Sequence, residues 1–384
     1  MDTMYKIINK KKRIATALAD VIGNVVFGAQ RFFRKQGEIP RPEIRNILVI
    51  RTAYIGDVVM TLPILKPLRE LFPGARISFL TSTGAVEVLE NNPFVDEVIA
   101  YDPFWFYRTP KGVYWKFITG MRSRTFDLVI EARADIREIL LLAWPLKARF
   151  RLSYDVGGGG YMLTHRVPYP GLRHKVEYHL DLVRFLGYEG TGLEWGVYLS
   201  EGEQTRVDAI LAHHGIRLPF IAVHPGSRLA LKRWPPKRYA EACDALTEKY
   251  GMPIVVFGAA GERMLVEEMA AHMRNKPILL VGEVSLREMA GVLSRAALFL
   301  CNDSAPMHIA AAMHTPTVAV FGPSKSVETG PYGAGHRVVE KNFPCRSGCD
   351  ENTCGNERYN ACMDDIAVRD VFEAAEELLR SAGK

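Results

Sequence analysis

Short apolar runs alternate with stretches of helical periodicity along most of the chain. In the first half, the runs Asn46–Arg51, Arg76–Thr81, Glu97–Tyr101 and Phe126–Glu131 are rich in β-branched residues, which predicts buried strands. Helical spacing between them, as over Val58–Leu71, predicts the connecting helices. Strands that alternate with helices favour a mostly parallel sheet covered on both faces.

The pattern loosens in the middle of the chain and then restarts. We expect a flexible loop at Gly157–Gly160, a helix over His174–Leu186 and a linker around Leu193–Leu218. Beyond the linker, strands and helices alternate again, which predicts a second doubly wound domain. The predicted strands and helices are Phe220–His224, Pro236–Tyr250, Pro253–Phe257, Glu262–Met273, Ile278–Val281, Leu286–Ser294, Leu298–Cys301, Pro306–Met313 and Thr317–Phe321.

These elements divide the chain into three parts. We expect an N-terminal arm over residues 1–43, a first α/β domain over 44–200 and a second over 201–384. With 384 residues, 48% of them hydrophobic, the chain can build two cores. Two such domains in tandem are expected to face each other across a cleft at the carboxyl ends of their strands, where ligands bind in open α/β sheets.

The arm carries the charge of the chain. Residues 1–45 hold ten Lys/Arg against four Asp/Glu, which accounts for the whole net charge of +6 and makes a nucleic-acid partner unexpected. Apolar residues recur at helical spacing over Ile14–Phe33, interrupted by Asp20 and Asn24. This pattern favours a basic amphipathic helix on a membrane surface over a helix packed on the protein's own core, and it disfavours a membrane span or a secretory signal.

Three segments that follow predicted strands could carry chemistry. The first contains Arg51, Gly56 and Asp57. Asp57 is predicted at a helix N-terminus, which favours its ionised form, so it is either a proton acceptor or a simple N-cap.

The second segment runs from His224 to Pro235. Its Gly-Ser turn at Ser227 leaves backbone amides free, and Lys232 with Arg233 could complete a phosphate site, although a basic loop can also be merely solvated.

The third segment contains Asp303, Ser304, Pro306 and His308. The first two are predicted to cap a helix of small residues that has Pro306 in its first turn. The positive end of this helix could hold a diphosphate, with His308 in reach.

Other chemistry lacks its sequence signals. There is no G-x-G-x-x-G after a predicted strand, no P-loop, no H-E-x-x-H and no D-x-D pair for a catalytic cation. Four of the six cysteines cluster at 345–362 without the paired C-x2-C spacing of common zinc sites. We interpret them as thiols in a compact loop, with a structural metal or iron-sulfur site as the alternative; they are Cys345, Cys349, Cys354 and Cys362.

Taken together, the three segments resemble glycosyltransferase family 9, whose best-known members are lipopolysaccharide heptosyltransferases. The resemblance runs from about Asn46 to the C-terminus and leaves the arm outside. It is carried by ILVIRTAYIGDVVMTLPILKPLRELFPGARISFLT, VHPGSRLALKRWPPKRYAEACDAL, VVFGAAGERMLVEEM and CNDSAPMHIAAAMHTPTVAVFGPS.

The resemblance implies a GT-B fold with two Rossmann-like domains, the first for the acceptor and the second for the nucleotide sugar. It further implies an inverting enzyme without a metal cofactor, and we expect Arg51, Gly56 and Arg233 to contact acceptor or phosphate groups. Asp57 matches the family's proposed general base, Lys232 the lysine at the donor phosphates, and Glu262 an acidic residue near the donor ribose. The segment that wraps the donor sugar and diphosphate is matched by Asp303, Ser304, Ala305 and His308.

The leading hypothesis is transfer of heptose from ADP-heptose to an anionic, lipid-linked lipopolysaccharide-core acceptor. The enzyme is then expected in the cytoplasm, peripheral on the inner face of the membrane, where the basic arm is attracted to anionic lipid. One alternative keeps the family with another nucleotide sugar and a different surface glycan. Another is a non-enzymatic, membrane-tethered binding protein.

Overall fold

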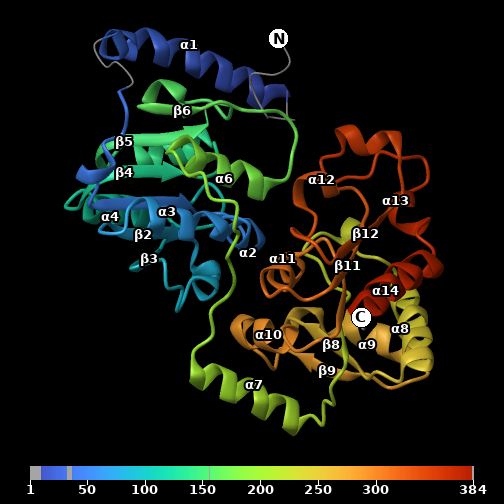
Figure 1. Cartoon of the computed structure of the whole chain (residues 1–384). Helices are drawn as coiled ribbons and strands as arrows, with labels where there is room; N and C mark the ends of the chain where they lie inside the picture. The colour runs from blue at the N-terminus through green and yellow to red at the C-terminus, as the bar shows by residue number, and fades with distance from the viewer. Residues whose placement is uncertain (1–9, 33–36, 155, 383–384) are drawn as a thin grey trace. The chain divides into compact units, whose positions relative to one another are not determined.

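The computed structural model describes residues 10–32, 37–154 and 156–382 and divides the chain into two compact units (Figure 1). Unit 1 ends at Trp195 and unit 2 begins at Gly196, whereas the sequence places the division after residue 200. Lys6, Phe33, Arg34 and Lys35 of the arm lie outside the described residues.

Unit 1 is built on a six-stranded sheet in which all neighbouring strands are parallel. Its strands are β1 (Asn46–Arg51), β2 (Arg76–Thr81), β3 (Glu97–Ala100), β4 (Thr125–Glu131), β5 (Lys147–Tyr154) and β6 (His165–Val167). The strand order is β3-β2-β1-β4-β5-β6. The order reverses between β1 and β4, and such a switch point is where open α/β sheets bind ligands.

The helices of unit 1 include one correction to the predicted pattern. They are α1 (Lys10–Phe32), α2 (Ile55–Val59), α3 (Leu65–Leu71), α4 (Lys111–Met121), α5 (Ile136–Glu138) and α6 (Lys175–Phe185), with short 3-10 or π segments at Arg41–Glu43, Leu62–Ile64, Thr83–Val88, Ile139–Ala143 and Gly160–Met162. The single helix predicted over Val58–Leu71 is wrong. Proline at position 63 has no N–H for the helical ladder, so α2 ends before it and a 3-10 turn leads into α3.

The region that looks irregular in sequence, between Leu146 and His174, contains the last two strands. The first half of β5 is exposed or only half-buried, which removes the apolar run that marks the other strands. The glycine segment after it is a buried loop with left-handed backbone at Gly158 and Gly159. This loop lies against α1: a Cβ at Gly158 would meet the Thr16 side chain, and the Gly159 backbone N–H donates to Asp20.

Unit 2 repeats the topology of unit 1. Its strands, all parallel, are β7 (Ile221–His224), β8 (Ile254–Gly258), β9 (Ile278–Val281), β10 (Leu298–Asn302), β11 (Thr317–Phe321) and β12 (His336–Glu340). The order β12-β11-β10-β7-β8-β9 is the same arrangement when the strands are counted within the unit. The second switch point therefore lies between β7 and β10.

The helices of unit 2 include one in the expected linker. They are α7 (Glu201–His213), α8 (Pro236–Tyr250), α9 (Arg263–His272), α10 (Leu286–Leu293), α11 (Ala305–Ala312), α12 (Ser326–Thr329), α13 (Ala361–Asp364) and α14 (Val368–Ala382), with 3-10 turns at Ala230–Lys232, Ala260–Glu262 and Pro344–Gly348. The linker prediction is wrong over α7 because Ser200 and Glu203 form a capping box that starts a helix despite its few apolar residues.

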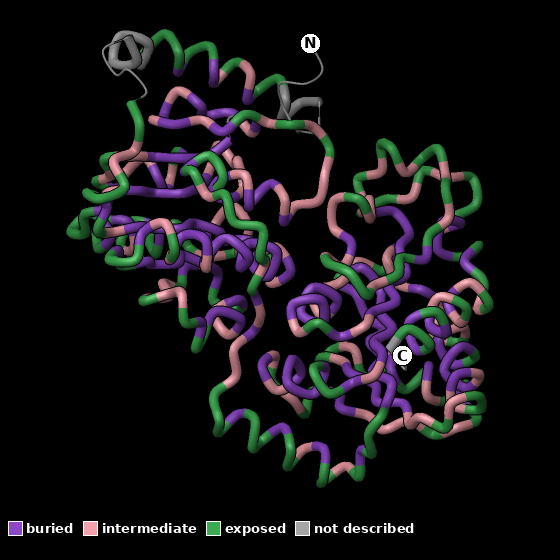
Figure 2. Tube along the Cα trace, viewed as in Figure 1, coloured by how far each residue is buried: buried purple, intermediate pink, exposed green. Residues whose placement is uncertain are grey.

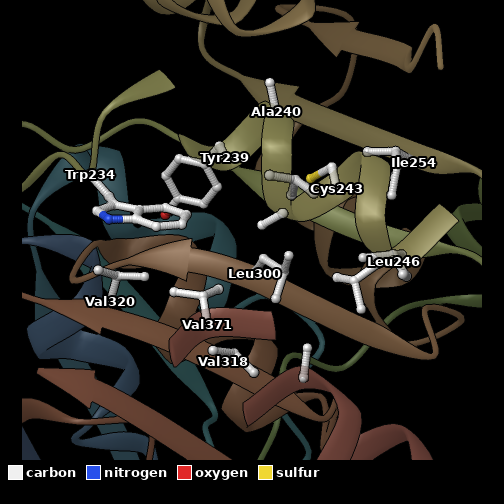
Figure 3. Close-up of a cluster of buried hydrophobic side chains, with 14 of the residues drawn as sticks. Trp234, Tyr239, Ala240, Cys243, Leu246, Ile254, Leu300, Val318, Val320 and Val371 are labelled. Carbon is white, nitrogen blue, oxygen red and sulfur yellow. The ribbon is translucent and has the colours of Figure 1, made fainter. Parts of the chain in front are cut away.

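The core of unit 2 supports the loop that follows β7. Trp234 and Tyr239 meet edge to face, with ring centroids 4.9 Å apart, over the apolar face of the sheet (Figure 3). The Trp234 indole N–H donates to the Ile366 carbonyl, and both rings are fully buried. This anchor fixes the end of the segment that carries Lys232.

Candidate functional site

Polar side chains gather at the switch point of unit 1. Asp57 lies in the first turn of α2, where its Oδ1 accepts hydrogen bonds from the Arg51 guanidinium at 2.8 Å and the Lys175 ammonium at 3.2 Å. Tyr54 holds the N-cap position, and its side chain makes no capping bond. The alternative of Asp57 as a simple N-cap is therefore wrong; its carboxylate is held by two cations.

The charge around Asp57 keeps it ionised. Burial by itself raises the pKa of a carboxyl, but Lys175, Arg51 and Arg133 outweigh it and hold the pKa of Asp57 well below its usual range. The side chain remains 18% exposed, so the carboxylate can meet a ligand. Gly56 beside it is buried in the same turn.

A buried acidic pair lies next to this cluster at the end of β4. Glu131 accepts hydrogen bonds from the Ser153 hydroxyl at 2.6 Å and the Ala134 backbone N–H at 2.8 Å. Glu138 accepts from the Thr52 hydroxyl at 2.7 Å, while its other oxygen has no hydrogen-bond partner among the described residues. Burial raises the pKa of both carboxyls, and Glu138 raises that of Glu131 further.

A buried histidine, His179, lies near the Asp57 cluster. Its Nδ1 lies 2.8 Å from the Met60 carbonyl, and the ring is buried. Burial, with Arg51 nearby, lowers its pKa to about 3, so the imidazole is neutral at physiological pH. A neutral ring donates to Met60 and supports the turn that carries Asp57 without adding charge.

At the switch point of unit 2, Lys232 lies between two carboxylates. Its Nζ is 2.7 Å from Asp303 Oδ2 and 2.6 Å from Glu351 Oε2. Burial lowers the pKa of a lysine, but the two carboxylates outweigh this effect and raise the pKa of Lys232. The ammonium is therefore charged, and Glu351 reaches it from the segment that contains the clustered cysteines.

A second polar contact, between a histidine and a carboxylate, belongs to the same unit. His224, the last residue of β7, places Nε2 3.1 Å from Glu262 Oε2, and the Ala259 backbone N–H donates to the same oxygen at 2.9 Å. Burial opposes ionisation, yet the hydrogen bond from His224 lowers the pKa of Glu262 to about 2. A Cβ at Gly226 would lie 2.1 Å from Glu262 Oε1, so this approach requires glycine there.

Two uncharged side chains join the loops of the unit 2 site. The Asn302 amide donates to the Pro225 carbonyl at 2.7 Å, and its oxygen accepts from the Trp234 backbone N–H at 3.0 Å. The Ser227 hydroxyl donates to the Asp303 carbonyl at 3.1 Å. These bonds fix the segment after β7 against the segment after β10.

The other predicted donor-site residues lie at the start of α11 and in the loop after β7. Ser304 is at the N-cap of α11 but forms no capping bond; its hydroxyl donates to the Asn302 carbonyl, so the predicted side-chain cap is wrong. Asp303 uses its carboxylate on Lys232 instead. Ala305 opens α11 and His308 is buried one turn later. Arg233 is directed to the Ser227 carbonyl, to which it donates at 2.8 Å.

The structure thus brings together Arg51 with Asp57, and Ser227, Lys232 and Asp303 with one another. Glu262 and Ser304 both lie close to His224. Sequence reasoning missed the long-range partners of these residues, because nothing in the local pattern marks them. They are Lys175, Arg133, Glu131, Glu138 and His179 in unit 1, and Asn302 and Glu351 in unit 2.

The four clustered cysteines are free thiols in the segment after β12. The Asn360 backbone N–H donates to Cys354 Sγ at 3.3 Å, and the Asn356 amide donates to Cys345 Sγ at 3.5 Å. Over the ranges that the structure describes, no group of three or more His, Cys, Asp or Glu is arranged to hold a metal ion.

The comparison with known protein families shows to which family the chain belongs. The sequence model of glycosyltransferase family 9 (heptosyltransferase) matches residues 114–360, well over half of the chain. The chain belongs to glycosyltransferase family 9. It is therefore a glycosyltransferase, and the non-enzymatic alternative is wrong.

Individual relatives of this glycosyltransferase agree with the assignment. Lipopolysaccharide heptosyltransferase 3 of Escherichia coli K12 is 28% identical over 345 residues, which cover 85% of this chain and 96% of that protein. The glycosyl transferase family 9 structure from Veillonella parvula is 26% identical, with a TM-score of 0.76, and covers 88% of this chain and 97% of its own.

The solved structure of E. coli ADP-heptose LPS heptosyltransferase II shares the fold. It is 24% identical, with a TM-score of 0.69, and covers 88% of this chain and 100% of its own. The predicted fold class is confirmed: each unit of this family 9 chain is a doubly wound α/β domain of the GT-B type, and an N-terminal helix precedes the first.

Proposed function

We propose that this enzyme transfers a heptose from ADP-heptose, with inversion and without a metal cofactor, to the lipid-linked core of lipopolysaccharide. The observation that carries the proposal is the pair of charge clusters, one at each switch point: Asp57 between cations, and Lys232 between carboxylates. Support comes from the relatives, which are named as lipopolysaccharide heptosyltransferases, one of them with ADP-heptose.

In this proposal Asp57 is the general base. The proton of the acceptor hydroxyl passes to the Asp57 carboxylate while the acceptor oxygen bonds to the anomeric carbon of the donor. The bond from that carbon to the diphosphate oxygen breaks, and ADP leaves with the electron pair. Attack from the face opposite the leaving group inverts the anomeric centre.

The low pKa of Asp57 gives its cations a second role. An ionised carboxylate held by Arg51 and Lys175 is a weak base, because those cations stabilise its charge. A phosphate on the acceptor competes for the same guanidinium and ammonium groups. Binding of an anionic acceptor therefore raises the proton affinity of Asp57 at the moment when a base is needed.

The donor is assigned to unit 2. Lys232 and the N-terminus of α11, whose N-cap is Ser304, supply positive potential for the departing diphosphate, a role that a metal ion plays in other transferases. Asp303, Ala305 and His308 belong to the same segment and are assigned to the sugar and diphosphate, with Ser227 and Arg233 alongside. Glu262, ionised beside His224, is assigned to accept hydrogen bonds from ribose hydroxyls.

The acceptor also suggests where the enzyme works. A lipid-linked glycan is confined to a membrane, and we place the enzyme in the cytoplasm, peripheral on the inner face of that membrane. The basic arm supports this location, because each Lys or Arg near an anionic surface is worth about 1 kcal/mol. No helix in the described part of the chain has the length and apolar character needed to cross a bilayer.

The test is donor binding followed by transfer. The purified enzyme should be stabilised against thermal unfolding by ADP and ADP-heptose but not by UDP-, GDP- or CMP-sugars, since binding to the folded state raises its stability. Transfer to a soluble core oligosaccharide should proceed in EDTA and yield the inverted anomer. A shift with a different nucleotide would move the enzyme to another donor, and dependence on added cation would refute the metal-free mechanism.

A further inference from the structure

Helix α1 packs on unit 1 with its polar side inward. Thr16 and Asp20 are only 8% exposed, although both are polar residues near the end of the chain. The apolar residues on the opposite side are 53–78% exposed, and Figure 2 shows the resulting alternation of exposed and buried positions along the helix. These exposed residues, here called the outer face, are Ile14, Leu18, Val21, Ile22, Val25 and Val26.

Specific contacts fix this orientation. Asp20 Oδ1 accepts a hydrogen bond of 2.7 Å from the Gly159 backbone N–H, and the bond is buried. Gly23 lies so close to the Tyr161 ring that a Cβ there would approach within 2.2 Å of it. The left-handed loop at Gly158 and Gly159 offers its backbone to the helix, so rolling α1 about its axis would break the bond and produce a clash.

This orientation of α1 is the reverse of the one expected for a helix that faces water. A helix on the surface of a soluble domain buries its apolar stripe and exposes polar residues. Here a continuous apolar stripe of six side chains faces outward while a carboxylate is buried, which signals that the outer face meets a non-aqueous partner. The interruption of the apolar run by Asp20 is therefore the attachment point of the helix.

Charge identifies the partner. The first four residues of α1, Lys10 to Arg13, are all basic, and the helix has no acid in its first turn. Pairing the outer face with that of a second copy would bring two such basic arms together, which like-charge repulsion opposes. An anionic lipid surface instead offers hydrocarbon for the outer face and negative charge for the basic residues Lys10 to Arg13.

We propose that the outer face of α1 inserts into the headgroup region of an anionic lipid surface while the Asp20–Gly159 bond attaches the helix to unit 1. This inference rests on the proposed membrane location and adds which side chains enter the lipid. It does not depend on the donor or on the chemistry of transfer. Unit 1 is also the unit assigned to the acceptor, so the attached domain is the one that must meet a lipid-linked glycan.

The test is co-sedimentation of the full chain with vesicles of phosphatidylcholine and phosphatidylglycerol. The double variant Val21→Glu/Val25→Glu should bind them roughly 100-fold more weakly than the parent, because burying each valine contributes roughly a tenfold change in affinity. The matched control is Val113→Glu/Leu172→Glu, which replaces two exposed apolar residues elsewhere in unit 1 with the same charge. The control should bind within about threefold of the parent, the residual effect being that of two added charges.

Three outcomes would overturn the proposal: no binding of the parent to anionic vesicles, equal binding of the two double variants, or a lipid-free dimer in sedimentation that Val21→Glu/Val25→Glu dissociates. The last would assign the outer face to a second copy. Transfer to a soluble acceptor, measured on the same proteins, separates this inference from the proposed function. Vesicle binding with the expected pattern but no transfer would refute the function and leave the lipid contact standing.

Discussion

The two switch points have the same strand order and opposite charge arrangements. In unit 1 a carboxylate, Asp57, lies between two cations; in unit 2 a cation, Lys232, lies between two carboxylates. Both central residues follow the first strand of their sheet, and both clusters take one partner from beyond the sixth strand, Lys175 in unit 1 and Glu351 in unit 2. The topology therefore fixes the place of the site, and the residue types at that place decide which partner it accepts.

The residue that ends the fourth strand shows a second contrast. In unit 2 it is Asn302, a neutral amide whose donors and acceptor are all used to join the loops. In unit 1 it is Glu131, a buried carboxyl near Glu138 that accepts hydrogen bonds from Ser153 of β5 and from the backbone of its own segment. Ionisation of the buried carboxyls in unit 1 lowers the stability of the fold, whereas the neutral amide in unit 2 carries no such cost.

The largest expected effect tests Asp57 as the base. Asp57→Asn keeps the size of the side chain but removes its proton affinity, so the rate of transfer should fall by about 1,000-fold. Donor affinity, measured by calorimetry, should stay unchanged, because the donor is assigned to unit 2. A parallel loss of donor affinity would remove the functional distinction between the two clusters.

The next effect tests the cation of unit 2. Lys232→Met removes the ammonium that faces the proposed diphosphate, and ADP affinity should fall by roughly 30-fold, as expected for loss of a charge-assisted contact. Lys237→Met, an exposed lysine of the same unit, is the matched control. If both variants bind ADP like the parent, Lys232 is a structural ion-pair partner only.

A smaller effect tests the buried carboxyls of unit 1. Because burial raises the pKa of Glu138, the folded state retains a proton that the unfolded state releases, so this contribution to stability is complete below about pH 4 and disappears as pH rises through the folded pKa. Glu138→Gln does not ionise. Its free energy of unfolding, relative to the parent, should improve by about 1 kcal/mol between pH 4 and pH 8.

The control for this pH profile is Glu189→Gln, which alters an exposed carboxyl of the same unit. Its difference from the parent should be flat over the same range in chemical denaturation. A flat profile for Glu138→Gln as well would show that Glu138 is ionised without cost, and the contrast with Asn302 would then be lost.

The smallest effect concerns Glu351. Its carboxylate pairs with the Lys232 ammonium, so a diphosphate that contacts Lys232 must compete with it. Glu351→Gln should therefore tighten ADP binding by about threefold, in the range of a partly exposed ion pair. Glu357→Gln, exposed in the same segment, should leave the calorimetric affinity unchanged; weaker binding by Glu351→Gln would instead make Glu351 part of the donor site.

Strands that carry a continuous apolar run could be predicted from the sequence, because such a run is typical of a strand in a parallel sheet. Asn46–Arg51, Arg76–Thr81, Ile278–Val281 and Thr317–Phe321 have the expected bounds. The half-exposed β5 and the polar α7 could not be found from apolar runs, although the capping signal at Ser200 was present for α7.

The sites divide in the same way. Loops after strand ends were recognisable because Gly, Pro and capping residues mark them. Their partners were not, because Lys175 is separated from Asp57 by 118 residues, and only the fold brings such residues together. The same holds for Glu351, which reaches Lys232 from a segment singled out for its cysteines.

The glycine at position 226 has a consequence for substitutions in this enzyme. The space that a Cβ would fill is taken by the Glu262 carboxylate, which in turn holds His224. Any replacement of Gly226, even by alanine, must displace a residue that is 36 positions away in sequence. Such a replacement would move the carboxylate away from His224, so the absence of a side chain in one loop preserves a hydrogen bond made by another.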